Sequence, residues 1–228
     1  MADSNFVKFI FQTSTLIQNS MAISKISDRL LEYGYTNDRL RQGLDLVQHT
    51  ETLTWRTDKA YGQSRQATRT LDEARTAAHR AYIKTLKIAR IAFDADGRAD
   101  TALKLSGPRK QSVDGWLDQA STFYANLAAD QTLGDGLRLY GYTAAKLNAE
   151  AVLVERVRQT LQIQAREAGE ARKATSDRDQ KLAELRAWVK KFRTVVKVAF
   201  SEDPQELEKL GIVVLNAPRR KKKTEPTA

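Results

Sequence analysis

Tyr33-Gly34-Tyr35-Thr36 decides how this chain is interpreted, because the same four residues return as Tyr140-Gly141-Tyr142-Thr143. The two stretches are 107 residues apart, and this offset aligns residues 9–106 with residues 116–213 without a gap. Of the 98 aligned pairs 24 are identical, whereas ordinary composition gives roughly six. The sequence therefore predicts two copies of one unit, and such a repeat governs the whole fold.

The composition favours an all-α protein. The chain has 228 residues, of which only 11 are Gly and 4 are Pro, and 29 % are charged, which suits helices better than turn-rich β structure. It has no cysteine, which excludes disulfides, thiolate metal sites and cysteine nucleophiles and is typical of a reducing compartment. We therefore expect a cytoplasmic protein. No apolar run approaches the length of about 18 residues that a membrane-spanning helix needs.

The repeat sets the expected domain organisation. We predict a first helical unit over 1–106, a linker over 107–115, a second unit over 116–213 and a basic disordered tail over 214–228. Each unit is expected to hold about three longer helices and one short helix. The two units are expected to pack as a pseudo-symmetric pair or as a consecutive array.

The apolar spacing locates the helices. A stripe at intervals of three and four residues predicts a first helix over 5–33. Gly34 then suits a left-handed helix end, and Thr36 suits the N-cap of the next helix. The flanking tyrosines are interpreted as wedges between helices, with a ligand site as the alternative. In the second copy, Gly134 and Gly136 weaken the first helix.

Residues 36–93 and 143–200 are helical in pattern with few interruptions. We predict a break near 63–69 and near 170–176, because Thr70-x-x-Glu73 has the spacing of a capping box. The absence of a Pro or Asn-Gly loop signal leaves one continuous helix as the alternative. Asp96 and Asp203 are expected to cap the short last helix of each copy.

The net charge of +10 favours association with polyanions. Lys and Arg gather near the end of the last long helix and in the tail, where two explanations compete: a solvated helix face, which we favour, and a phosphate-binding surface. The candidate polyanion-binding residues are Arg186, Lys190, Lys191, Arg193, Lys197, Arg219, Arg220, Lys221, Lys222 and Lys223.

The sequence carries no motif of known site chemistry. It has no phosphate-binding glycine loop, no dinucleotide fingerprint, no nucleophile elbow and no Glu-x-x-His pair of a dimetal bundle. The two histidines, His49 and His79, align with Arg156 and Arg186, so the copies share no histidine site. We therefore expect a protein that is not an enzyme and has no catalytic residue, cofactor or metal.

Three functions are weighed. The first is a structural, assembly or scaffold protein that acts through self-association or a protein partner, because the chain is duplicated and has long helical seams. The alternative is a polyanion-binding protein, such as a nucleic-acid binder, that uses the basic helix ends and tail. The second alternative is peripheral membrane association through Phe6 to Phe11 and the tail, which we consider the weakest.

Overall fold

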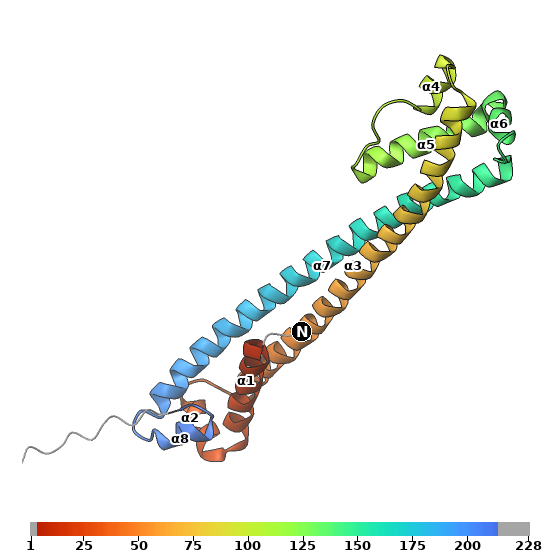
Figure 1. Ribbon diagram of the computed structural model, residues 1–228. Coiled ribbons are helices and arrows are strands. Elements are labelled where there is room, and N and C mark those ends of the chain that lie inside the picture. The colour runs from red at the N-terminus through yellow and green to blue at the C-terminus, as the bar shows by residue number, and fades with distance from the viewer. Residues whose placement is uncertain (1–3, 214–228) are drawn as a thin grey trace, which may run out of the picture. The chain divides into compact units, whose positions relative to one another are not determined.

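The computed structural model describes residues 4–213, and residues 1–3 and 214–228 lie outside the described part (Figure 1). The predicted all-α class is confirmed: the described residues form helices and no strand. In chain order the helices are α1 (Ser4–Ala22), α2 (Ser24–Glu32), α3 (Asn37–Ala92), α4 (Gly97–Leu103), α5 (Val113–Ala129), α6 (Gln131–Arg138), α7 (Ala144–Ala199) and α8 (Gln205–Lys209).

The chain folds into two compact units. The central unit is one continuous segment, Lys59–Arg172, and the terminal unit joins residues up to Asp58 with residues from Lys173 onward. The two 56-residue helices, α3 and α7, each contribute one portion to each unit. Each compact unit therefore combines residues from 9–106 with residues from 116–213, the two stretches that align in the sequence.

The central unit has its own apolar core. Figure 1 shows α4, α5 and α6 gathered around the last turns of α3 and the first turns of α7. Tyr82 of α3 and Phe123 of α5 meet edge to face with ring centroids 5.4 Å apart, and both side chains are fully buried. Burial of large aromatic side chains of this kind stabilises a core by area and by ring geometry.

The terminal unit is built in the same way around α1, α2 and α8, the first turns of α3 and the last turns of α7 (Figure 1). Tyr35, Trp188 and Phe192 form its aromatic centre, with Trp188 and Phe192 centroids 5.0 Å apart. The Tyr35 side chain is 3 % exposed. Tyr35 is therefore a predicted wedge packed between helices, whereas the prediction is wrong for Tyr33 and Tyr140, which are 38 % and 46 % exposed.

The predicted helix corners are confirmed. Gly34 and Gly141 both have a φ of +77°, a left-handed conformation that glycine adopts without strain. The Tyr35 backbone N–H donates to the Leu30 carbonyl at 3.0 Å, and the Tyr142 N–H donates to Leu137, as in a glycine-terminated helix end. The Thr36 and Thr143 hydroxyls accept from backbone N–H groups three residues later, which is the expected N-cap bond.

The predicted breaks near 63–69 and 170–176 are wrong, because α3 and α7 run through both stretches. The hydroxyls of Thr68 and Thr70 donate to the carbonyls of Ser64 and Gln66, one helical turn back. A threonine that bonds backwards in this way sits inside a helix without ending it. The spacing of Thr70 and Glu73 was therefore not a helix start.

The predicted first helix over 5–33 is interrupted instead. Ile23 is extended, with φ −95° and ψ 106°, and separates α1 from α2. Its aligned partner Asp130 has nearly the same angles and caps α6 by accepting from the Thr132 N–H. Gly134 and Gly136, which were expected to weaken this region, lie inside α6.

One of the two predicted caps of the short helices is confirmed. The Asp96 side chain accepts from the backbone N–H groups of Arg98 and Ala99 at the start of α4. The prediction for Asp203 is wrong, because α8 has no side-chain cap and the Asp203 carboxylate instead pairs with Lys25 at 2.8 Å. The preceding loop thus uses this aspartate to join α2 to α8.

Several contacts of the described residues recur at positions 107 residues apart. The Asn19 side chain donates to the Lys209 carbonyl at 2.7 Å, and the Asn126 side chain donates to the Ala102 carbonyl at 2.6 Å. Two more pairs behave alike. Arg186 lies over the Phe9 ring, and at the aligned positions His79 packs against Trp116. Arg39 lies over the Tyr35 ring, and at the aligned positions Lys146 lies over Tyr142.

Candidate anion-binding site

Four of the predicted polyanion-binding residues share one face of α7 in the terminal unit. Their spacing of four, three and four residues places them one above another on a helix. They line a shallow hollow of about 360 Å³ together with Val189 and Thr194, and we call them the α7 basic face. These residues are Arg186, Lys190, Arg193 and Lys197.

The structure does not bring every candidate to this face. Lys191 is exposed on α7 but does not line the hollow, because it lies about 100° around the helix from Lys190. The tail residues, from Arg219 to Lys223, lie outside the described residues, so their predicted role stays a prediction.

The α7 basic face is not neutralised by carboxylates of the described chain. Its four side chains form no ion pair within residues 4–213, and the nearest acid in sequence, Glu184, pairs with Lys181 at 2.6 Å. The Arg193 Nε atom is buried and has no hydrogen-bond acceptor among the described residues. An unpaired buried donor of this kind is costly.

Several cations elsewhere in the described chain are paired with carboxylates. Arg41, Arg166 and Lys181 pair with carboxylates that are one or three residues away on the same helix. Arg158 also pairs with Glu155 at 3.3 Å. These pairs reduce the local positive potential, whereas no such pair forms on the α7 basic face among the described residues.

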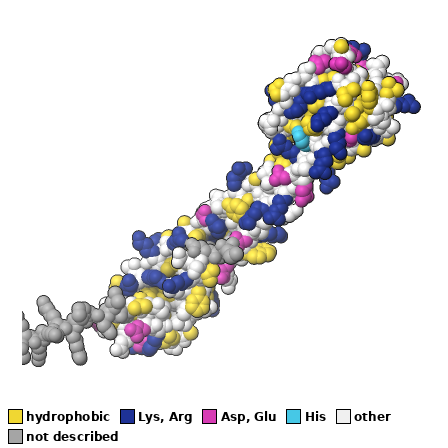
Figure 2. All heavy atoms as spheres, in the orientation of Figure 1, with side chains coloured by type: hydrophobic (Ala, Val, Ile, Leu, Met, Phe, Trp, Pro, Cys, Tyr) yellow, Lys and Arg dark blue, Asp and Glu magenta, His cyan; other side chains and the backbone are white. Residues whose placement is uncertain are grey.

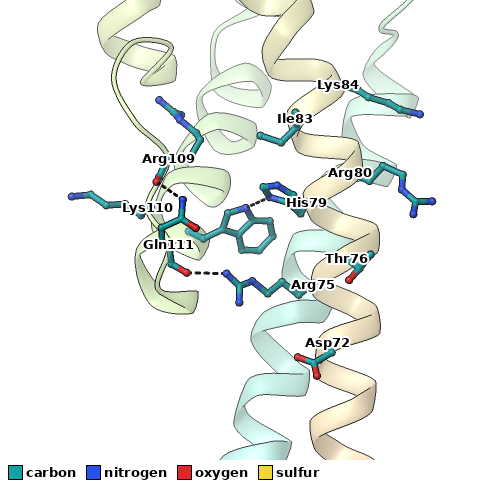
Figure 3. A pocket seen from close by; sticks show the side chains of 11 residues that line it. Asp72, Arg75, Thr76, His79, Arg80, Ile83, Lys84, Arg109, Lys110 and Gln111 are labelled. Atoms are coloured by element: carbon teal, nitrogen blue, oxygen red, sulfur yellow. Dashed lines mark hydrogen bonds between the residues drawn. The ribbon is translucent and has the colours of Figure 1, made fainter.

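A second basic hollow lies in the central unit, between α3 and the segment before α5. It has a volume of about 840 Å³. Figure 3 shows Arg75 and His79 reaching from α3 toward residues 109–111. The Trp116 indole Nε1 donates to the His79 Nδ1 at 3.0 Å. In the sequence, His79 stands out only as the residue aligned with Arg186, and this hollow was not predicted.

Arginines fix the segment that closes one side of this hollow. Arg109 donates to the Tyr82 hydroxyl and to the carbonyls of Lys104 and Ser106, each at 2.8 Å. Arg75 donates to the Gln111 carbonyl at 2.9 Å. The predicted linker over 107–115 is thus tied to α3, and its last three residues belong to α5.

The basic residues in the last turns of α3 make two kinds of contact. Arg90 donates from its guanidinium to the Leu105 carbonyl. Arg80 and Lys84 line the hollow and have no acceptor among the described residues. Figure 2 shows Lys and Arg side chains on the visible surface of the central unit around apolar patches, with fewer acidic side chains.

Two carboxylates, one buried (Glu206) and one partly buried (Glu150), make hydrogen bonds within the fold. Hydrogen bonds from Lys209 and then Lys25 lower the pKa of Glu206 below its ordinary value, and its side chain is 7 % exposed. In the central unit, Glu150 accepts from the hydroxyls of Thr85 and Tyr124. Burial, followed by the nearby Glu150 charge, raises the pKa of Tyr124, so this phenol stays a hydrogen-bond donor.

The aromatic start of α1 divides between core and surface. Ile10 is buried, while Phe6 and Phe9 pack against the terminal core. Val7 and Phe11, four residues apart, are 55 % and 71 % exposed. No helix in residues 4–213 has the length and hydropathy to cross a bilayer, and those residues contain no cluster of acidic or histidine side chains that could hold a metal.

No protein-family model, curated protein or solved structure matches this chain.

Proposed function

We propose that this protein binds a polyanion, of which nucleic acid is the example, through the α7 basic face. The observation that carries the proposal is the set of four aligned cations that have no carboxylate partner in the described chain. Clustered Lys and Arg of this kind attract phosphates and release counterions on binding. The net charge of +10 adds a long-range attraction.

The side chains of the α7 basic face would contact the phosphate backbone of the nucleic acid. Arg186 and Lys197 are eleven residues apart, which is about 16 Å along the helix at 1.5 Å per residue. Val189, the apolar residue beside them, is buried, and no aromatic side chain lines the hollow. Without a stacking platform or a helix placed for groove readout, binding is expected to be independent of base sequence.

The salt dependence of duplex binding tests this proposal. Each phosphate contact contributes about 0.9 to the slope of log K against log[salt], so four contacts contribute about 3.6. Neutralising Arg186, Lys190, Arg193 and Lys197 to Gln should reduce the slope by about that amount. Between 50 and 200 mM KCl, wild-type affinity should therefore fall roughly 150-fold more than the affinity of the variant.

The matched control removes the same charge from paired positions: R41Q/R158Q/R166Q/K181Q. Fluorescence polarisation of a labelled 20-base-pair duplex provides the measurement. Equal slopes for the two quadruple variants would mean that net charge, and not the α7 basic face, governs binding. An absence of duplex binding at 50 mM KCl would refute the proposed function.

We further propose that the two compact units are copies of one contact pattern, with the later parts of the two repeats exchanged. The recurring Asn19–Lys209 and Asn126–Ala102 bonds support this. So do the helix bounds: Asn37–Ala92 and Ala144–Ala199 are offset by the same 107 residues as the sequences. In this arrangement neither repeat completes a unit alone.

A second candidate function, assembly through protein contacts, is favoured by one observation. Large apolar side chains are exposed at equivalent positions of both repeats: Ile91 at 60 % and Val198 at 55 %. Tyr33 and Tyr140 are also exposed at the two corners. Light scattering across a protein concentration series, without nucleic acid, tests this function; a monomer at all concentrations would exclude self-assembly as its mode.

A further inference from the structure

We propose that the central hollow beside His79 binds the phosphate group of a small molecule, independently of the α7 basic face. The hollow has about 840 Å³, which falls in the range of small-molecule sites. Asp72 is the one acidic residue that lines it, against five Lys or Arg side chains and His79. Its ligand is therefore expected to be an anion larger than phosphate alone, such as a phosphate monoester.

The bond from Trp116 orients the histidine for anion binding. An indole N–H is only a donor, so the His79 Nδ1 must be the acceptor in their 3.0 Å bond. As long as this bond is made, the only N–H of the imidazole is at Nε2. His79 is exposed whereas Trp116 is 1 % exposed. The indole thus holds the ring in one tautomer, and Nε2 is the ring nitrogen left for a ligand.

The cations around His79 divide into fixed and available groups. Arg75 and Arg109 are engaged with the carbonyls that shape the segment before α5. Arg80, Lys84 and Lys110 are exposed and have no ion pair among the described residues. Figure 3 shows Arg80 and Lys84 extending from the flank of α3 away from residues 109–111. Their long side chains would therefore have to move to reach the ligand. Such mobile cations can neutralise its charge but do not fix its orientation.

The lining also limits what else the ligand carries. Trp116 is buried, so it offers no face on which a base can stack, and Ile83 is a partly buried apolar contact. Thr76 and Gln111 supply uncharged polar groups. The hollow is therefore suited to a phosphorylated polar molecule, such as a sugar phosphate, and not to recognition of a nucleobase.

Histidine NMR provides a direct test, because the chain has only two histidines, His49 and His79. Inorganic phosphate, glucose 6-phosphate and a single-stranded oligonucleotide are each titrated into the full chain at pH 7.5 and constant ionic strength. A His49→Gln variant assigns the two ring signals. His49 lies on the terminal unit and serves as the internal control.

The expected result is a saturable shift of the His79 signal alone with phosphate and with glucose 6-phosphate, the latter binding more tightly. K84Q/K110Q should weaken that binding roughly tenfold, while the equally charged control K8Q/K87Q should not. R186Q/K190Q/R193Q/K197Q should leave the His79 shift unchanged, which separates this site from the proposed polyanion surface. Parallel, non-saturating shifts of both histidines, or a His79 shift with the oligonucleotide alone, would overturn the proposal.

Discussion

Replacing Gly43 by Ala should destabilise the terminal unit, although alanine favours helix. A Cβ at position 43 would lie 2.5, 2.6 and 2.8 Å from three ring atoms of Trp188. The ring is packed against Tyr35 and Phe192. Overpacking of this kind costs about 1–3 kcal/mol, and the gain in helix propensity offsets about 1 kcal/mol of it. The net expectation is a loss of up to about 2 kcal/mol.

Gly62 provides the matched control in the same helix. No atom lies within 4 Å of a Cβ built at Gly62, so G62A should show only the propensity gain of about 0.5–1 kcal/mol. Urea denaturation followed by circular dichroism at 222 nm measures both variants, provided that the m-values agree with that of the wild type. The two substitutions should therefore move the transition in opposite directions.

Testing G43A in a W188L variant shows whether contact with the Trp188 ring causes the destabilisation. In W188L the six-membered ring is gone, so G43A added to W188L should be neutral or stabilising. The coupling between the two positions should be about 1–3 kcal/mol, as for other contacting residues. If G43A costs the same with and without the indole, contact with Trp188 is not the reason for the glycine and the packing argument fails.

Three further predictions test other features. Asn19→Ala and Asn126→Ala should each cost about 1 kcal/mol of unfolding free energy, and a loss in only one variant would contradict the equivalence of the two bonds. Glu206 has a lowered pKa in the folded state, so its stabilising effect is present at neutral pH and is lost as pH falls below its ordinary 4.5. A urea series from pH 6 to pH 3 should therefore show a shallower decline for Glu206→Gln. Gln66→Pro, at an exposed position inside α3, should cost about 3 kcal/mol; a tolerated proline, by thermal melts, would refute the continuous helix.

The corners of the fold could be predicted because their chemistry is local. A glycine with positive φ followed two residues later by a capping threonine needs only the residues of the turn. The same holds for Asp96, whose cap bonds reach two and three residues ahead. Each of these capping contacts is made by residues that are close in sequence, so it can be predicted from one sequence alone.

The predictions of helix ends were wrong where the same residue type is compatible with both a helix end and a helix interior. Thr70 has the spacing of a helix cap and also the hydroxyl that bonds back to Gln66 within a helix. Packing along α3 and α7 decides between them, and the local pattern does not. Likewise, Ile23 ends α1 with no glycine or proline at the break, so no turn signal was there to find.

The candidate site was predictable only in part. The spacing of Arg186, Lys190, Arg193 and Lys197 is visible in the sequence, because all four lie on one helix. The His79 hollow depends on Trp116 and on a segment fixed by Arg109, which come from elsewhere in the chain. The alignment of 9–106 with 116–213 also could not show that each compact unit combines residues from both stretches, because it does not tell which helices pack together.

The composition of the two units has a consequence during synthesis. Residues 59–172 leave the ribosome as one block and make up the whole of the central unit. The opening helices, made first, must wait until residues 173–213 have been added before Asn19 can reach Lys209 and their apolar stripe can be covered. Translation thus completes the central unit before the terminal unit, and a chaperone that shields exposed apolar helices would be needed most by α1 and α2.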